Sequence, residues 1–418
     1  MFATSRFPQL GFLAMMLAGC ANTASSIASA PAASAAPPAF QAARITVDGV
    51  QPLPLPPAGT ASATAASMSP AAPVPAPVPA RPAALPPGAA PAPLPSFPSI
   101  PGGFSRDTAS AFAQAAAASR QLPADWTTAA MDNAQYHAQV ASLMAPTRGG
   151  KPVVRSWTTY RGRFVEPIRI RKGRAFMEQN QAALQRAERE YGVPGHVIAA
   201  IIGVETLYGE QTGSFRVLDA LSTLAFAYPD ASRPERAAMF QDQLADFLLW
   251  TYQSGLDPAA PRGSFAGAMG MPQFMPTSIL KFAVDGDGDG RIDLQNNSTD
   301  AILSVANFLR QHGWVPGLPV FAPARLSPQA QALADGGLVP RQDWQALQLA
   351  GASLAPGASD QATWLQHPLG VIDLKDEARG VTEFRTGTPN FFALTQYNRS
   401  YFYATAVNDL AQALLRQP

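Results

Sequence analysis

The sequence predicts a mainly helical protein with a small β-containing lobe inserted before its last helix. Apolar residues recur at helical spacing in most segments between residues 104 and 311. Short strand-like segments appear only after Gly317, and the segment 400–415 returns to the helical pattern. A helical body with one small β lobe follows from this order.

The elements can be assigned in chain order. Gly192 and Pro194 separate two helices, and Pro194 suits the first turn of the second. That second helix is apolar on nearly every face, so we expect it to be central. We expect helices at 104–144, 174–191, 197–206, 218–227, 237–253, 277–282, 299–311 and 400–415. We expect strands at 370–374, 381–385 and 391–396, in a lobe spanning about 318–396.

The folding unit occupies the last three quarters of the chain. Residues 1–102 hold 21 of the 41 prolines and four of the charged side chains. The remaining 316 residues carry 27 basic and 28 acidic side chains, and they are numerous enough for a sizeable core. This near-neutral balance argues against a nucleic-acid binder, and a single cysteine excludes a disulfide framework. The predicted domain is therefore 103–418.

The first residues are typical of an export signal. Arg6 precedes an apolar stretch at 10–18 that is too short to span a bilayer. The sequence LAGC at 17–20 resembles the lipobox of bacterial lipoproteins, which implies a signal peptide at 1–19 and acylation of Cys20. With Ala21 next, the resemblance implies an outer-membrane anchor and a periplasmic domain. An ordinary buried cysteine near a standard signal site is the alternative.

The composition of residues 20–102 predicts a disordered linker that begins at Cys20. They are rich in Ala, Pro and Ser and show neither a helical nor an alternating period. Such a segment buries too little apolar surface to offset its ordering entropy. Its prolines favour an extended, semi-rigid spacer.

One glutamate stands out in the apolar central helix. Residues 202–209 read IGVETLYG, so Glu205 lies at the C-terminal end of an otherwise apolar segment. Burial and the negative end of the helix dipole both disfavour its ionised form. A carboxyl that stays protonated near neutral pH is what a general acid needs. A glutamate that frays into solvent at a helix end is the alternative.

Two further motifs are candidates for binding. Residues 263–276 read GSFAGAMGMPQFMP, where glycines let a ligand approach the backbone and Gln273 can donate and accept hydrogen bonds. A packed turn between helices would explain the same residues. Residues 285–293 read DGDGDGRID, like the start of an EF-hand loop, although position 12 is Asn296 instead of glutamate. A solvated acidic turn is the alternative, but closely spaced aspartates repel one another without a cation.

Taken together, the motifs VETxxG and GSFAGAMGxxQFMP resemble the B-type membrane-bound lytic murein transglycosylases. The similarity extends from about residue 157 to 403 and includes LDAL at 218–221 and HGW at 312–314. The resemblance implies a lysozyme-like helical core with a helical N-terminal lobe. It also implies cleavage of the β-1,4 bond between N-acetylmuramic acid and N-acetylglucosamine in peptidoglycan without water, which leaves a 1,6-anhydro end.

The same resemblance assigns roles to individual residues. Glu205 matches the single catalytic acid/base. Substrate contacts match Tyr160, Ser264, Gln273, Tyr397, Asn398 and Tyr403. A structural Ca²⁺ would be held in a loop at 285–300 by Asp285, Asp287, Asp289, the Arg291 carbonyl and Asp300. Implied partners are peptidoglycan glycan strands, the outer membrane through the anchor, and possible cell-wall synthesis proteins.

Two other functions compete with this interpretation. A hydrolytic N-acetylmuramidase would use water, but ordinary glycosidases need a second carboxylate. Asp219 is the only local candidate, and its LDAL setting at 218–221 fits a helix start or a structural contact better. A non-catalytic peptidoglycan-binding lipoprotein is the other alternative, and the presence of Glu205 argues against it.

Overall fold

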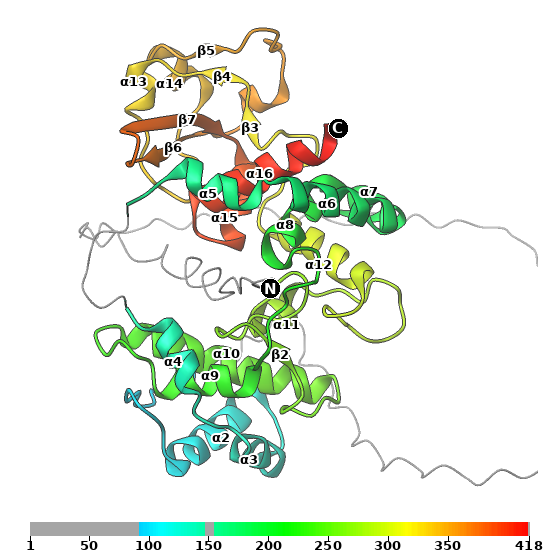
Figure 1. Ribbon diagram of the computed structural model, residues 1–418, viewed down its shortest axis with the longest axis vertical. Helices are drawn as coiled ribbons and strands as arrows, with labels where there is room; N and C mark the ends of the chain where they lie inside the picture. Colours follow the sequence, from blue (N-terminus) through cyan, green and yellow to red (C-terminus); the bar gives the residue numbers. More distant parts are fainter. Residues whose placement is uncertain (1–91, 147–153, 417–418) are drawn as a thin grey trace, which may run out of the picture. The chain divides into compact units, whose positions relative to one another are not determined.

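The computed structural model describes residues 92–146 and 154–416 and is mostly helical (Figure 1). Its helices are α2 (Arg106–Arg120), α3 (Ala124–Asp132), α4 (Ala138–Met144), α5 (Trp157–Phe164), α6 (Pro167–Gln179), α7 (Gln181–Tyr191), α8 (Gly195–Thr206), α9 (Val217–Phe226), α10 (Pro234–Gln253), α11 (Pro276–Phe282), α12 (Ser298–Gln311), α13 (Pro328–Gln331), α14 (Trp344–Leu349), η2 (Thr363–Gln366), α15 (Pro389–Tyr397) and α16 (Tyr401–Leu415). The strands are β1 (Phe215–Arg216), β2 (Arg262–Gly263), β3 (Phe321–Ala322), β4 (Ala324–Arg325), β5 (Ser353–Leu354), β6 (Gly370–Asp376) and β7 (Val381–Gly387). The predicted fold class, mainly helical with a small β lobe before the last helix, is confirmed.

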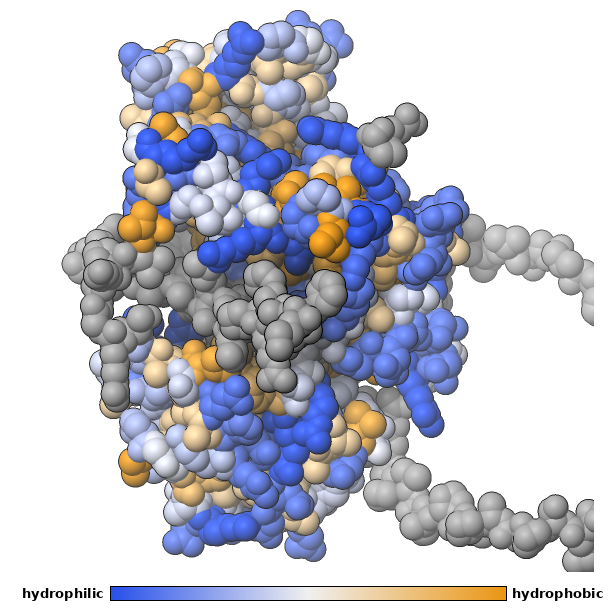
Figure 2. All heavy atoms as spheres, in the orientation of Figure 1, coloured by the Kyte–Doolittle hydropathy of each residue, from blue (hydrophilic) through white to orange (hydrophobic). Residues whose placement is uncertain are grey.

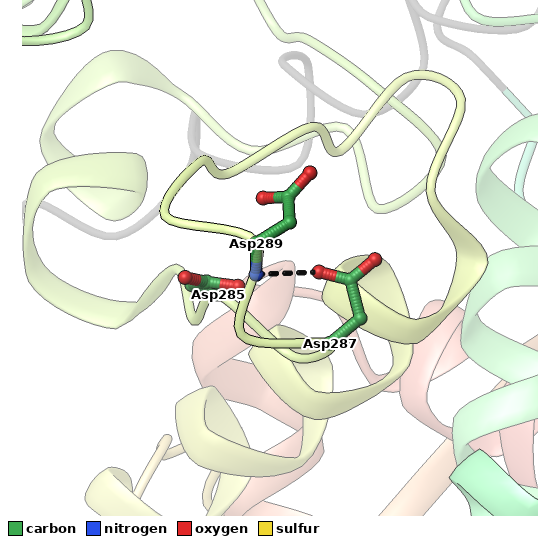
Figure 3. Close-up of side chains that lie close together, drawn as sticks. All are labelled: Asp285, Asp287 and Asp289. Atoms are coloured by element: carbon green, nitrogen blue, oxygen red, sulfur yellow. Dashed lines mark hydrogen bonds between the residues drawn. The ribbon is translucent and has the colours of Figure 1, made fainter. Parts of the chain in front are cut away.

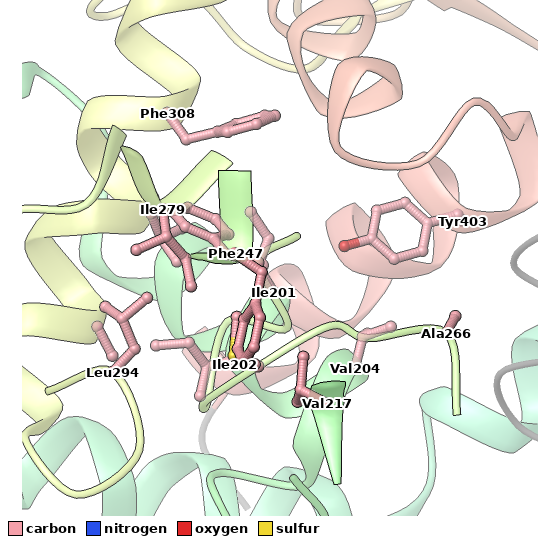
Figure 4. Packing of buried hydrophobic residues seen from close by; sticks show 14 of the residues in the cluster. Ile201, Ile202, Val204, Val217, Phe247, Ala266, Ile279, Leu294, Phe308 and Tyr403 are labelled. Carbon is pink, nitrogen blue, oxygen red and sulfur yellow. The ribbon is translucent and has the colours of Figure 1, made fainter. Parts of the chain in front are cut away.

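The central position predicted for α8 is also confirmed. Apart from Glu205 and the half-buried His196, its side chains are buried, and the helix packs against α6, α7, α12 and α16. Figure 4 shows Ile201, Ile202 and Val204 of this helix among apolar side chains from the surrounding elements. Because α8 is enclosed by other helices, a polar group on it is held in an apolar environment.

The long helical region predicted at 174–191 is divided in two. Asn180 leaves the helical backbone region (φ −113°, ψ 23°) and is both the C-cap of α6 and the N-cap of α7. Its side chain donates to the carbonyl of Phe176 and accepts from Ser298. Asparagine competes for backbone hydrogen bonds in this way, so the helix ends where the apolar period alone predicts continuation.

Residues 92–102 pack against the helical body, although composition assigned them to the linker. Phe97 forms edge-on contacts with Phe112 of α2 and Phe226 of α9, at ring-centroid distances of 5.4 and 6.5 Å. The amide of Ile100 donates to the carbonyl of Phe226 (2.8 Å), and the Ser99 hydroxyl accepts from the amide of Tyr228 (2.8 Å). These contacts extend the folded unit to the N-terminal side of the predicted boundary.

The β lobe follows the predicted strands with one correction. Strands β6 and β7 pair antiparallel, from Gly370 opposite Gly387 to Asp376 opposite Val381, and β3 joins the other edge of β7. The segment 391–396, predicted as a strand, is helical and belongs to α15. Thr388 caps this helix and Pro389 occupies its first turn, which are helix-start signals that the apolar run concealed.

The predicted signal peptide, Cys20 and residues 21–91 of the linker lie outside the described residues. Within residues 92–146 and 154–416, no helix combines the length and apolarity needed to cross a bilayer.

Candidate active site

Glu205 lies in the last turn of α8, where the chain leaves the helix sharply. Leu207 and Tyr208 both adopt left-handed backbone conformations, with φ values of 52° and 62°. The ring of Tyr208 folds back over Gly203, where an added Cβ would lie 2.5 Å from the ring. The glycine therefore permits the tight end of the helix that presents Glu205.

The environment of Glu205 favours the protonated carboxyl. The side chain retains a little accessible surface, but the protein encloses it, and this burial raises its pKa from 4.5 to about 8. The hydroxyl of Tyr403 donates to Oε1 of Glu205 at 2.7 Å, which lowers the pKa in part. The carboxyl is thus mostly protonated at neutral pH, as a general acid requires.

Three tyrosines from three helices surround this carboxyl. Tyr403, at the start of α16, is fully buried and stacks on Tyr397 of α15, with ring centroids 6.3 Å apart and planes 14° apart. Figure 4 shows the hydroxyl of Tyr403 pointing from α16 toward α8. Burial first, and then the charge of Glu205, raise the pKa of Tyr160, Tyr397 and Tyr403. The structure therefore brings four of the predicted site residues together.

Gln273 is connected to this cluster through its neighbour. The hydroxyl of Tyr397 donates to the carbonyl of Pro272 at 2.6 Å. Gln273 itself has a left-handed backbone (φ 50°), and its Nε2 donates to the carbonyls of Thr212 and Gly270, each at 3.0 Å. Its amide is therefore held in one orientation, and the Oε1 atom remains available as an acceptor.

Ser264 and Asn398 occupy fixed positions on neighbouring elements. Ser264 is buried just after β2, and its hydroxyl accepts from the amide of Ala268 at 3.0 Å. Asn398 is half-buried between α15 and α16, and its carbonyl accepts from Ser400, the N-cap of α16. Among the described residues, neither side chain forms a hydrogen bond with Glu205, whose carboxyl is bonded by Tyr403.

Arg169 contacts α8, a contact that the sequence did not suggest. This buried side chain on α6 donates from Nε to the carbonyl of Gly203 (2.9 Å) and from Nη1 to that of Arg163 (2.6 Å). It thereby ties the last turn of α8 to α5. No sequence pattern marks this contact, because both acceptors are backbone carbonyls, which every residue carries.

Asp219 has a structural role. Its Oδ1 accepts from the amide of Gln135 (2.9 Å) and pairs with Arg216 (3.0 Å). These contacts fasten the segment before α4 to the start of α9. They agree with the structural interpretation of the LDAL motif.

The acidic loop brings three carboxylates together. Asp285, Asp287 and Asp289 each offer an oxygen, and these oxygens lie within 4.8 Å of one another (Figure 3). The two oxygens of Asp285 also accept from the amides of Gly288 (2.8 Å) and Gly290 (2.9 Å). Converging carboxylate oxygens on a loop shaped by glycines are the donor set that Ca²⁺ prefers.

Asp300 closes this loop from α12. It is almost fully buried, and its two oxygens accept from the amides of Gly286 and Asp293, both at 2.7 Å. Burial raises the pKa of Asp300, as do the charges of Asp287 and Asp285. Arg291 contributes an amide that donates to Asp289 at 2.8 Å. Three of the predicted ligands therefore converge, while Asp300 fastens the loop backbone.

A mainly helical fold that holds a glutamate of raised pKa among tyrosines is the arrangement expected of an enzyme that cleaves glycosidic bonds. The model of the family described as "Transglycosylase SLT domain" matches residues 104–412. The membrane-bound lytic murein transglycosylase B of Escherichia coli K12 is 41% identical over 277 residues, which are 65% of this chain and 71% of the relative. The chain belongs to the SLT transglycosylase family and is a lytic transglycosylase.

Solved structures agree with this assignment. The catenated lytic transglycosylase SltB1 of Pseudomonas aeruginosa is 36% identical (TM-score 0.64; 73% of this chain and 96% of that chain). The E. coli Slt35 structure in complex with calcium is 34% identical (TM-score 0.63; 76% and 96%). SltB3 of P. aeruginosa in complex with NAG-NAM-pentapeptide is 30% identical (TM-score 0.63; 75% and 80%).

Proposed function

We propose that this enzyme cleaves the β-1,4 bond between N-acetylmuramic acid and N-acetylglucosamine in peptidoglycan, with Glu205 as its single acid/base. The observation that carries the proposal is the carboxyl of Glu205, held protonated by burial and hydrogen-bonded by Tyr403. The complex of the relative SltB3 with NAG-NAM-pentapeptide supports the substrate class.

The proposed reaction needs one carboxyl in two protonation states. Glu205 first donates its proton to the glycosidic oxygen as the bond from that oxygen to C1 of the muramoyl sugar breaks. The resulting carboxylate then takes the proton of the muramoyl C6 hydroxyl, while the C6 oxygen forms a bond to C1. Tyr403 hydrogen-bonds the carboxylate between the two steps, and Glu205 ends protonated again.

The surrounding side chains suit a glycan. Tyrosine rings cover the apolar C–H surface of sugar rings, while their hydroxyls and the amide of Gln273 offer hydrogen bonds. Substrate contacts are accordingly proposed for Tyr160, Ser264, Gln273, Tyr397, Asn398 and Tyr403.

Mass spectrometry of digested sacculi tests the proposal. The wild type should release products with 1,6-anhydro ends, and Glu205→Gln should lower their rate of release by at least about 10³-fold, because the proton donor is lost. The matched control is Glu210→Gln, since Glu210 is exposed and pairs with Lys172. Reducing ends in place of anhydro ends would indicate a hydrolase. Full lysis by Glu205→Gln would contradict the mechanism.

We propose Ca²⁺ as a structural ion of the acidic loop. The converging oxygens of Asp285, Asp287 and Asp289 support it, and the relative Slt35 has been crystallised in complex with calcium. Ligands proposed in addition are the Arg291 carbonyl and Asp300. Because the ion would bind the native loop but not the unfolded chain, it would stabilise the fold by mass action.

Chelation tests the calcium proposal. Adding EDTA should lower the Tm of the wild type by several degrees, and excess Ca²⁺ should restore it. Asp287→Asn should have a lower Tm in Ca²⁺ and a weaker response to EDTA. An unchanged Tm on chelation would argue against the ion.

For the N-terminal residues we propose a lipid anchor at Cys20 in the outer membrane, a spacer up to residue 91 and a periplasmic domain. The family relative from E. coli is membrane-bound by name, and proline-rich segments form semi-rigid spacers. Cell fractionation tests the anchor, because Cys20→Ser should release the enzyme from the membrane. Shortening the spacer should reduce access to the wall but leave activity on soluble glycan intact.

A further inference from the structure

Basic side chains are concentrated on one short stretch of this nearly neutral chain. Residues 161–174, which form α5, α6 and their junction, carry six Arg or Lys and one acidic residue. Lys172 pairs with Glu210, and Arg161 pairs with Asp409. Arg174 donates instead to backbone carbonyls at the end of α16, and within residues 92–146 and 154–416 no carboxylate pairs with it. A positive surplus therefore remains where α6 meets the end of α16.

A cavity of about 350 Å³ opens at this junction. Its lining combines positive charge with apolar surface: three arginines (Arg161, Arg174 and Arg416) and three apolar side chains (Val165, Ile170 and Ala413). Its acidic residue, Asp409, is bound on both sides, by Arg161 at 2.6 Å and by Arg385 at 2.6 Å. The cavity thus combines cationic donors with apolar surface in its lining.

Exposed apolar side chains flank the same surface. Ile168 on α6 is 51% exposed and Leu415 at the end of α16 is 54% exposed, while Arg171 is exposed one helical turn beyond Ile168. Figure 2 shows an apolar patch bordered by hydrophilic residues over the region of α6 in Figure 1. Large aliphatic side chains beside arginines are typical of surfaces that meet lipid headgroups.

We propose that this surface, which we call the α6 patch (Arg161, Val165, Ile168, Ile170, Arg171, Arg174, Leu415 and Arg416), docks on a membrane containing anionic phospholipids. Arginine guanidinium groups bind phosphate in a two-pronged manner, and Ile168 and Leu415 enter the boundary between headgroups and acyl chains. Both properties match a phospholipid. The carboxylates of wall peptides would satisfy the arginines but not the apolar residues.

Docking by the α6 patch is distinct from the reaction and from the proposed anchor. The patch is built from α5, α6 and α16, and its residues are not those proposed to contact the glycan. A membrane contact of the folded domain would hold the enzyme at the bilayer and compete with its access to the wall. The α6 patch would then set how much of the enzyme reaches its polymer.

Vesicle sedimentation tests the proposal on the full-length chain carrying Cys20→Ser, so that no acyl chain contributes. Vesicles of phosphatidylcholine with 30% phosphatidylglycerol are compared with vesicles of phosphatidylcholine alone. The protein should partition onto the anionic vesicles at least about tenfold better, and added salt should weaken this binding.

Charge reversal in the α6 patch identifies the surface. Arg171→Glu with Arg416→Glu should weaken binding to anionic vesicles by at least about tenfold, because each basic residue near the surface contributes several-fold to partitioning. The matched control is Arg189→Glu, since Arg189 is exposed on α7 outside the patch and should change binding less than about twofold. Ile168→Ser should weaken binding about threefold through the apolar contact.

Activity on soluble glycan should be the same in the Cys20→Ser parent protein and in its three variants. This activity also shows that the variants are folded. Equal vesicle binding by the patch and control variants would overturn the proposal. It would also be overturned if the patch variant lost binding to purified sacculi but not to vesicles, or if the protein bound inorganic phosphate but no vesicles. Vesicle binding is measured without turnover, so its result tests the docking proposal independently of the proposed reaction.

Discussion

At the scale of single residues, Glu205 lowers the stability of the fold near neutral pH in the position proposed for the acid/base. Burial at the end of α8 raises its pKa to about 8, so at neutral pH the native state holds a proton that the unfolded chain releases. Tyr403 opposes this shift with one hydrogen bond. We therefore expect Glu205 and Tyr403 to contribute to the pH dependence of stability and, in the proposed mechanism, to that of activity.

The first prediction concerns stability and pH. Below pH 4.5 the carboxyl is protonated in both states, and above pH 8 it is ionised in both. Between these values only the native state binds the proton, so this residue lowers the free energy of unfolding by up to about 1.4 kcal/mol per pH unit as pH rises. Glu205→Gln removes that loss. Denaturant titrations at pH 5, 6, 7 and 8 should show that the free energy of unfolding of the variant increases with pH relative to that of the wild type. If the difference between the two proteins stayed constant with pH, the pKa shift would be refuted.

The second prediction concerns the hydrogen bond to Glu205. Tyr403→Phe removes the donor that stabilises the carboxylate, so the pKa of Glu205 should rise and the alkaline limb of the kcat–pH profile should move to higher pH. We expect kcat to fall by about 10-fold to 100-fold. Tyr401→Phe is the matched control, because that hydroxyl donates to the carbonyl of Gly337 instead. An unmoved alkaline limb in Tyr403→Phe would count against the role of the bond.

At the scale of elements, the β lobe positions a helix of the site. Asp376, the last residue of β6, accepts from the amide of Thr158 (3.0 Å), from its hydroxyl, and from that of Ser156 (3.1 Å). These bonds hold the first turn of α5, which carries Tyr160. Hydrogen bonding by Thr158 lowers the pKa of Asp376. The lobe thus acts on the site through the first turn of α5, to which Asp376 is hydrogen-bonded.

The third prediction follows from this arrangement. Asp376→Ala should reduce stability by about 1–2 kcal/mol, as loss of a helix cap does. Because Tyr160 would be held less firmly, KM for a soluble glycan should rise about threefold to tenfold, with kcat within about twofold. Asp373→Ala, on the same strand and paired to Lys375 at 3.5 Å, serves as the control. A similar KM for the two variants would exclude positioning by Asp376.

At the scale of the whole molecule, the folded unit is larger than composition indicates. The segment 92–102 lies against α2, α9 and α10, and Nε2 of Gln241 donates to the carbonyl of Phe97 (3.1 Å). Proline-rich composition continues through this segment, but Phe97 supplies the apolar surface that the preceding residues lack.

The fourth prediction tests this boundary. Deleting residues 92–102 from the full chain should lower the free energy of unfolding by about 2–4 kcal/mol, because aromatic packing and several hydrogen bonds are lost. Deleting 81–91, a segment of equal length, should change it by less than about 0.5 kcal/mol. Denaturant titration measures both. If the two deletion variants were equally stable, the folded domain would begin at residue 103, as predicted from the sequence.

Much of the site was predictable because its motifs are local. A glutamate at the end of an apolar helix indicates a raised pKa, and repeated Asp-Gly pairs indicate a loop with converging carboxylates. The strand predicted at 391–396 was wrong because five apolar or β-branched residues outweighed the cap at Thr388 and the proline after it. Arg169 was missed because its partners, Gly203 and Arg163, are backbone carbonyls that no sequence pattern marks.

The sequence by itself determined the helical class, the central apolar helix and the glutamate at its end, since each depends on residues close together in the chain. The tertiary structure decided that Tyr160, Tyr397 and Tyr403 meet at that glutamate, and that Asp376 holds α5. Contacts between residues 198 or 218 positions apart depend on how helices pack, and packing depends on the shapes of all the buried side chains together. The same reason explains why 92–102 belongs to the fold: its partners lie on helices that only folding brings near.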